Sequence, residues 1–134
     1  MLTIYTDGAS SGNPGPGWAM WVVQKNKKTL SERVRLDHCT NNEAEYLSVI
    51  HALKWLAKNT IWYSDETNIV FKLDSQLVVK QLNGQYKLKD ARMRAYASEV
   101  HLLVANLQKQ VVFTHIPRDE NRADSLKYDT TRRC

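Results

Sequence analysis

Three carboxylates stand where a folded chain could use them for chemistry. Asp7 ends an apolar, β-branched run at residues 2–7, and Asp74 ends a second such run at residues 67–74. Glu45 lies in a helical pattern between the two runs. If the three converge, each pair at about 4 Å repels by about 4 kcal/mol at an effective dielectric of 20. Protonation or a cation must offset this repulsion, and oxygen-only ligands select a hard ion such as Mg²⁺ or Mn²⁺. Because Mg²⁺ usually also binds substrate phosphates, the residue types favour phosphoryl transfer.

A glycine- and proline-rich stretch at residues 8–17 follows Asp7 directly. It is not a nucleotide-binding P-loop, because Trp18 stands where that motif requires a lysine. It does not match the dinucleotide fingerprint either, since a strand and not a helix is predicted next. Two interpretations stay open: a wide hairpin turn, or a backbone that lets a bulky polymer approach closely.

The elements that must position these carboxylates follow from the apolar periodicity. Thr40 and Glu43 fit a capping box that begins a helix ending near residue 58, and Glu45 lies on its otherwise apolar face. Glu45 is therefore predicted to face the sheet. The other predicted elements are strands at 2–7, 18–23, 29–36, 67–74 and 110–116 and helices at 75–83, 90–108 and 119–134.

This β-β-β-α-β-α-α-β-α order predicts an α/β domain with a mixed sheet. Strand 2–7 would pair antiparallel with its hairpin partner and parallel, through a right-handed helical crossover, with strand 67–74. Ligands bind at such a switch point, at the carboxyl ends of the strands. Asp7 and Asp74 both lie at that end.

Length and composition bound the class of protein. A chain of 134 residues predicts one domain spanning residues 1–134, and 43% hydrophobic with 25% charged residues is typical of soluble proteins. With no apolar run long enough to span a bilayer and no targeting peptide predicted, we expect a cytoplasmic protein without a membrane partner. The net charge of +5 favours a polyanionic partner.

Four segments taken together resemble type 1 ribonuclease H. They are TDGASSGNPGPG at 6–17, TNNEAEY at 40–46, LDSQLVVKQLNGQYKLK at 73–89 and HIPRDENRADSL at 115–126. They occur in the family's order and cover nearly the whole chain. The resemblance implies a ribonuclease H-like α/β fold with a five-stranded mixed sheet and helices on both faces. It also implies an endonuclease that hydrolyses the RNA strand of RNA/DNA hybrids, leaving 3′-hydroxyl and 5′-phosphate ends. We expect a monomer.

The same resemblance assigns four catalytic carboxylates that bind two Mg²⁺ ions, with Mn²⁺ as a substitute: Asp7, Glu45, Asp74 and Asp124. Asp7 would bridge both ions, one of which lowers the pKa of the attacking water while the other stabilises the leaving oxygen. Asp124 follows Asn121 by one residue fewer than the family commonly has. Its carboxylate is therefore expected at a shifted angle.

Contacts to the hybrid are also implied. RNA carries a 2′-hydroxyl that a protein can read from the minor groove, where the resemblance places Ser10, Ser11, Asn13, Asn41, Gln76 and Glu45. Thr40 and Asn42 are expected to hold the DNA strand. Lys87 and Lys89 are expected to bind phosphates from a loop too short for the extra basic helix of some members. Arg118 and His115 are candidate auxiliary side chains, of which Arg118 is expected nearer the metal ions.

Two other functions stay open from the sequence. One is a non-catalytic nucleic-acid-binding module of the same fold. Such a module would have no reason to retain all four carboxylates, because they repel one another. The other is a DNA-acting nuclease of the same superfamily, which the residues expected to read the 2′-hydroxyl argue against.

Overall fold

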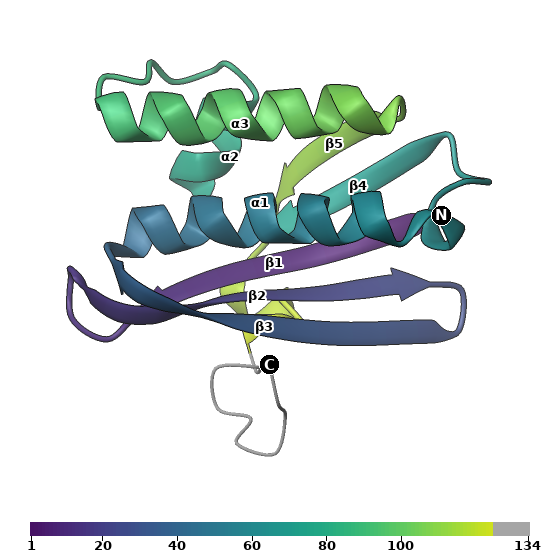
Figure 1. Ribbon diagram of the computed structural model, residues 1–134, viewed down its shortest axis with the longest axis horizontal. Coiled ribbons are helices and arrows are strands. Elements are labelled where there is room, and N and C mark those ends of the chain that lie inside the picture. The colour runs from purple at the N-terminus through teal and green to yellow at the C-terminus, as the bar shows by residue number, and fades with distance from the viewer. Residues whose placement is uncertain (125–134) are drawn as a thin grey trace.

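A computed structural model describes residues 1–124 of the protein (Figure 1). The strands are β1 (Leu2–Ser10), β2 (Gly15–Lys25), β3 (Lys28–Cys39), β4 (Asn68–Leu73) and β5 (Gln110–His115). The helices are α1 (Asn41–Lys58), α2 (Gln76–Leu82) and α3 (Ala91–Leu107), with 3₁₀-helices η1 (Thr60–Trp62) and η2 (Arg118–Glu120). None of the helices in this part of the chain is long and apolar enough to cross a bilayer.

The five strands form one mixed sheet in the order β3-β2-β1-β4-β5. β1 pairs antiparallel with β2 and parallel with β4, and β4 pairs parallel with β5. The predicted switch point at the first strand and the five-stranded mixed α/β sheet are therefore confirmed. Helices were expected on both faces, but α1, α2 and α3 all pack into the core on one face within residues 1–124. α1 connects β3 to β4, and it lies against one face of the sheet, over β1 (Figure 1).

The glycine-rich stretch is mostly strand. The β1–β2 pairing continues from Asp7↔Met20 through Gly8↔Ala19 to Ser10↔Gly17, which leaves only residues 11–14 as the turn. The sequence-based bounds, with a first strand ending at residue 7 and a second beginning at 18, were too short. Hydrogen bonding to a neighbouring strand carries the ladder through glycines whose intrinsic strand propensity is low.

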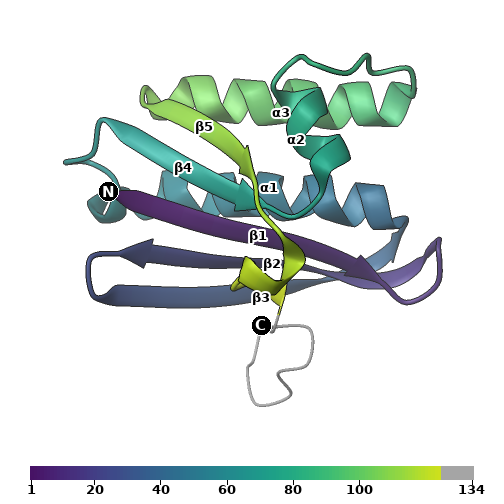
Figure 2. The same ribbon diagram turned by 180° about the vertical axis from the view of Figure 1, so that it is seen from behind.

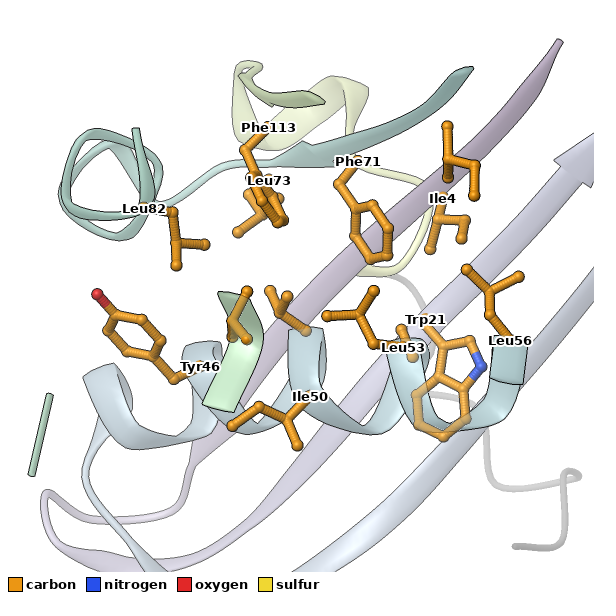
Figure 3. Packing of buried hydrophobic residues seen from close by; sticks show 14 of the residues in the cluster. Ile4, Trp21, Tyr46, Ile50, Leu53, Leu56, Phe71, Leu73, Leu82 and Phe113 are labelled. Carbon is orange, nitrogen blue, oxygen red and sulfur yellow. The ribbon is translucent and has the colours of Figure 1, made fainter. Parts of the chain in front are cut away.

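The main core lies between the sheet and the helices (Figure 3). Ile4 of β1 and Phe71 of β4 point toward Leu53 and Leu56 of α1, and all four side chains are fully buried. Each such burial contributes on the order of 2 kcal/mol. This packing fixes the distance and rotation of α1 relative to β1 and β4, and so fixes where a side chain in its first turns can reach.

The start of α1 is fastened on two sides. The predicted capping box is present, with Glu43 N donating to Thr40 Oγ1 (3.1 Å) and Thr40 N donating to Glu43 Oε1 (3.0 Å). Glu43 Oε2 also accepts from Arg92 Nη1 (3.3 Å) and Tyr96 OH (3.1 Å) of α3. The hydrogen bond from the Thr40 backbone leads the contacts that hold the pKa of Glu43 below its usual value. The first turn of α1 is therefore held against α3 as well as against the sheet.

The opposite face of the sheet carries a smaller apolar cluster that the chain after β5 covers (Figure 2). Tyr5, Met20 and Val22 contact Ile116 and Ala123 there. The helix predicted to begin at residue 119 does not form up to residue 124; η2 ends at Glu120, and Asn121 has an extended backbone (φ −84°, ψ 106°). The rest of that predicted helix lies outside the described residues.

Candidate active site

Three carboxylates from three elements converge at the carboxyl ends of β1 and β4. Asp7 lies in β1, Asp74 directly follows β4, and Glu45 lies in the second turn of α1. Each offers an oxygen within 4.8 Å of the others. Asp7 and Glu45 are buried, 5% and 8% exposed, and Asp74 is half-buried. Buried like charges at this separation repel strongly, so the donor set suits a hard divalent cation.

Gly8 explains how a helix on one face of the sheet reaches an aspartate in the strand. A Cβ at Gly8 would lie 2.2 Å from the carbonyl carbon of Ala44, so α1 rests directly on the strand backbone. The amide of Gly8 donates to Asp7 Oδ1 (3.0 Å) and to Glu45 Oε1. One glycine therefore admits the helix and supplies the N–H that links the two carboxylates.

Ser48 is a second anchor, which the sequence reasoning missed. It is fully buried one turn after Glu45, and its Oγ lies 2.6 Å from the carbonyl oxygen of Asp7 and 2.8 Å from that of Ala44. The same Oγ accepts from Met20 N at 3.3 Å. The hydroxyl thereby connects α1 to β1 and β2 beside Asp7. A serine on an otherwise apolar helix face was the available signal.

Asn121 is the other missed residue. It is 5% exposed, and its Nδ2 donates to Asp74 Oδ2 (2.9 Å) and to the carbonyl oxygen of Thr6 (2.9 Å), while its Oδ1 accepts from Ala123 N (3.0 Å). It thus orients the Asp74 carboxylate and fastens the chain after β5 to β1. No periodicity in residues 117–124 predicts that an asparagine in this charged run is buried.

Asp124 is placed differently from the other three predicted carboxylates. It lies after η2, is half-buried, and its backbone amide donates to the carbonyl oxygen of Asn121 (3.1 Å). Within residues 1–124, the group of carboxylates that share the 4.8 Å limit contains Asp7, Glu45 and Asp74 without Asp124. The structure therefore brings together three of the four, and the role of Asp124 stays a prediction.

The carboxylates line an open cleft together with several predicted substrate residues. Its walls include Ser10, Asn41, Asn42 and Arg118. Asn41 Oδ1 accepts from Ser10 Oγ (2.8 Å), and Asn41 N donates to Asn13 Oδ1 (3.0 Å). The β1–β2 hairpin is thus bonded to the start of α1 at the rim of the cleft.

The remaining predicted residues are not among those that line this cleft. Thr40 caps α1, Ser11 is exposed in the hairpin turn, and Gln76 is exposed at the start of α2. Lys87 and Lys89 are exposed in the connection between α2 and α3. His115 ends β5 and is exposed, so of the two auxiliary candidates Arg118 is the one that reaches the cleft.

Burial and the charge of Asp7 together raise the pKa of Glu45 well above its usual value of 4.5. A carboxyl whose pKa is raised on folding holds a proton that the unfolded chain has released. Its contribution to stability is therefore fully present below pH 4.5 and is lost as the pH rises through the folded pKa. A cation bound by the carboxylates would oppose this loss, because it favours the ionised form.

We expect the metal-free protein to unfold at progressively lower temperature as the pH is raised above 4.5, and Mg²⁺ or Mn²⁺ to reverse this trend. Thermal unfolding across pH, with and without metal, measures both effects. The matched control is Glu45→Gln, which keeps the shape but cannot ionise and should flatten the pH dependence. An unchanged slope in Glu45→Gln would show that another group is responsible.

A mixed sheet with its switch point at β1, and an acidic cleft at the ends of two parallel strands, define an α/β domain whose three converging carboxylates could hold a metal ion. Comparison with known proteins is more specific. The family model RNase H matches residues 1–126. The chain belongs to the RNase H family, and the resemblance found in its four motifs is confirmed.

Individual relatives agree with this assignment. Ribonuclease HI of Halobacterium salinarum is 36% identical over 125 residues, which is 91% of this chain and 60% of that protein. The bifunctional protein Rv2228c of Mycobacterium tuberculosis is 29% identical over 96% of this chain but only 35% of its own length. The chain therefore spans between about a third and three fifths of the length of these two relatives.

Solved structures show the same fold. The crystal structure of RNase H1 from Halobacterium salinarum superposes with a TM-score of 0.82 at 34% identity, covering 93% of this chain and 92% of that one. LC11-RNase H1, solved in complex with an RNA/DNA hybrid, superposes with a TM-score of 0.86 at 33% identity, covering 94% and 93%.

Proposed function

We propose that this protein is a ribonuclease H that hydrolyses the RNA strand of RNA/DNA hybrids with two divalent cations, leaving 3′-hydroxyl and 5′-phosphate ends. The observation that carries the proposal is the convergence of Asp7, Glu45 and Asp74 within 4.8 Å in a chain of the RNase H family. The complex of LC11-RNase H1 with a hybrid supports the choice of substrate. In this proposal residues 1–134 act as one catalytic domain and as a monomer.

The residues of the cluster fit a pair of hard ions. All three donors are carboxylates, two of them buried, and a hydrogen bond from Gly8 or Asn121 orients each one. Asp7, at the centre, would contact both ions, and Glu45 and Asp74 would each hold one; Asp124 would complete the second. When bound, Mg²⁺ supplies activation of water and stabilisation of the leaving oxygen. Manganese is expected to substitute, because it prefers the same ligands.

The chain's own residues supply position and discrimination. Ser10 and Asn41, bonded to each other at the rim of the cleft, present hydroxyl and amide groups that can bond a ribose 2′-hydroxyl and that deoxyribose leaves unpaired. Arg118 brings a positive charge to the wall of the cleft, where the scissile phosphate would lie. Contacts of this kind recognise the sugar and the phosphate, so they do not discriminate between base sequences.

The test is cleavage of end-labelled RNA/DNA hybrid, duplex DNA and duplex RNA, with Mg²⁺ or Mn²⁺ and then with excess chelator. We expect cleavage of the hybrid alone, loss of cleavage in chelator, and product ends that a ligase joins because they carry a 5′-phosphate and a 3′-hydroxyl. Cleavage that persists in chelator would contradict the metal-dependent mechanism. Binding without cleavage would indicate a docking module, and equal cleavage of duplex DNA a DNA-acting nuclease. Near-full activity of Asp124→Asn would remove Asp124 from the proposed ligands.

A further inference from the structure

A second pocket, lined mainly by the β1–β2 hairpin, lies next to the active-site cleft. The two share Ala9 and Ser10 as lining residues. Trp18 of β2 and Arg35 of β3 line the second pocket. Trp18 also packs against the apolar cluster of Tyr5 and Met20, which places it on the face of the sheet opposite α1. We call this the Trp18–Arg35 pocket.

The side chains in and beside this pocket are basic and aromatic. Trp18 pairs with Arg35 across the β2–β3 ladder, and Met20 pairs with Arg33 two residues further along, so both arginines leave the sheet on the same face. The Arg33 guanidinium carbon lies 4.3 Å from the centroid of the Trp18 ring, a cation–π contact that holds the ring in place. Arg35 is exposed. Among residues 1–124, none of the ion pairs between side chains engages Arg35.

The position of the pocket indicates which strand of a hybrid it would meet. Asn41 and Asn42 begin α1, which packs on the face of the sheet opposite Trp18, and Ser10, which is bonded to Asn41, lines both the cleft and the Trp18–Arg35 pocket. If Thr40 and Asn42 hold the DNA strand and the hairpin faces the minor groove, the RNA strand leaves the carboxylates on the Trp18 side. An arginine there can pair with a backbone phosphate, and an indole can pack against a sugar or base.

We propose that Trp18, Arg33 and Arg35 form a binding surface for the sugar–phosphate backbone of the RNA strand next to the cleavage site. This inference rests on the proposed function and adds a contact region to it. Two observations carry the inference: the positive charge of the arginines, which is complementary to phosphate, and the position of the pocket next to the acidic cleft. The α2–α3 connection at residues 83–90 contains no helix in the described structure, so the proposed surface would add basic contacts elsewhere.

The test compares Arg35→Gln with Lys27→Gln, which removes the same charge from an exposed residue at the far β2–β3 turn. Binding of a fluorescent hybrid is titrated in an Asp7→Asn background over a series of salt concentrations, and steady-state cleavage is measured with Asp7 intact. For Arg35→Gln we expect a several-fold rise in Kd and KM, an unchanged kcat, and a salt slope smaller by about 1. Arg35→Lys should recover most of the affinity, whereas Lys27→Gln should match the parent.

The strand assignment is tested with hybrids in which either the RNA or the DNA strand is shortened stepwise from each end. The difference between Arg35→Gln and parent should vanish when the RNA strand is shortened past the contact and should persist when only the DNA strand is shortened. Dependence on the DNA strand, or parental Kd and KM in Arg35→Gln, would overturn the inference while hybrid cleavage by the parent still stands. A parent protein that neither binds nor cleaves hybrid would overturn the proposed function and this inference together.

Discussion

Asp7→Asn is expected to lower hybrid cleavage by about 10³-fold or more, because it removes several kcal/mol of charge stabilisation at the centre of the proposed metal site. The amide has the shape of the carboxylate and can still accept from Gly8 N, and the Asp7 carbonyl stays bonded to Ser48. The fold should therefore persist. Without metal the variant should melt at a higher temperature than the parent, since one of three mutually repelling charges is gone.

Cleavage rates with Mg²⁺ and melting temperatures with and without Mg²⁺ measure both parts of this prediction. The control is Asp65→Asn, which removes an aspartate whose side chain is 70% exposed and pairs with Lys25 away from the cleft. It should keep parental activity, because exposed ion pairs contribute little. Parental activity in Asp7→Asn would contradict the proposed metal site.

Gly8→Ala is expected to have the second-largest effect. The added methyl carbon would lie 2.2 Å from both the carbonyl carbon and oxygen of Ala44 and 2.5 Å from Glu45 N, all of them backbone atoms. Neither strand nor helix can yield by a side-chain rotation, so α1 must shift away from β1. Overpacking of this kind typically costs about 1–3 kcal/mol. The shift also withdraws Glu45 from Asp7, so cleavage should fall even at temperatures where the variant is fully folded.

Gly84→Ala provides the matched control. Gly84 follows α2 with φ +75°, and nothing lies within 4 Å of the place that an added methyl carbon would take, so the cost comes only from the left-handed backbone, about 1–2 kcal/mol. The two variants should lose similar stability in thermal unfolding, but only Gly8→Ala should lose activity per folded molecule. Equal activity in both would show that α1 can shift without displacing Glu45.

Local patterns predicted the elements that carry the site. The capping box at Thr40 and Glu43 formed as expected, because its two hydrogen bonds join residues three positions apart. The strand that ends directly before Asp74 and the burial of Glu45 followed from periodicities of two and 3.6 residues, because one face of each element is buried and the other is exposed. The crossover rules then placed β1 between β2 and β4.

Other features depend on contacts that no local pattern encodes. The strands run into the glycine stretch because their partners continue the ladder, and the helix predicted from residue 119 does not form up to residue 124. The segment is extended at Asn121, whose side chain bonds to the carbonyl oxygen of Thr6, a residue 115 positions earlier. The offset of Asp124 from the acidic cluster belongs to the same segment.

The α/β order and the placement of three carboxylates on predicted elements could be read from residue types and short-range periodicity, and the family from the resemblance of four motif segments. The folded molecule was needed to show that a glycine lets α1 touch β1, that Asn121 orients Asp74, and that Trp18 and Arg35 line a pocket next to the cleft. These features depend on the spacing and register of packed elements. Spacing and register are set by the packing of the whole core. These features therefore form only when residues that are distant in the chain have packed together.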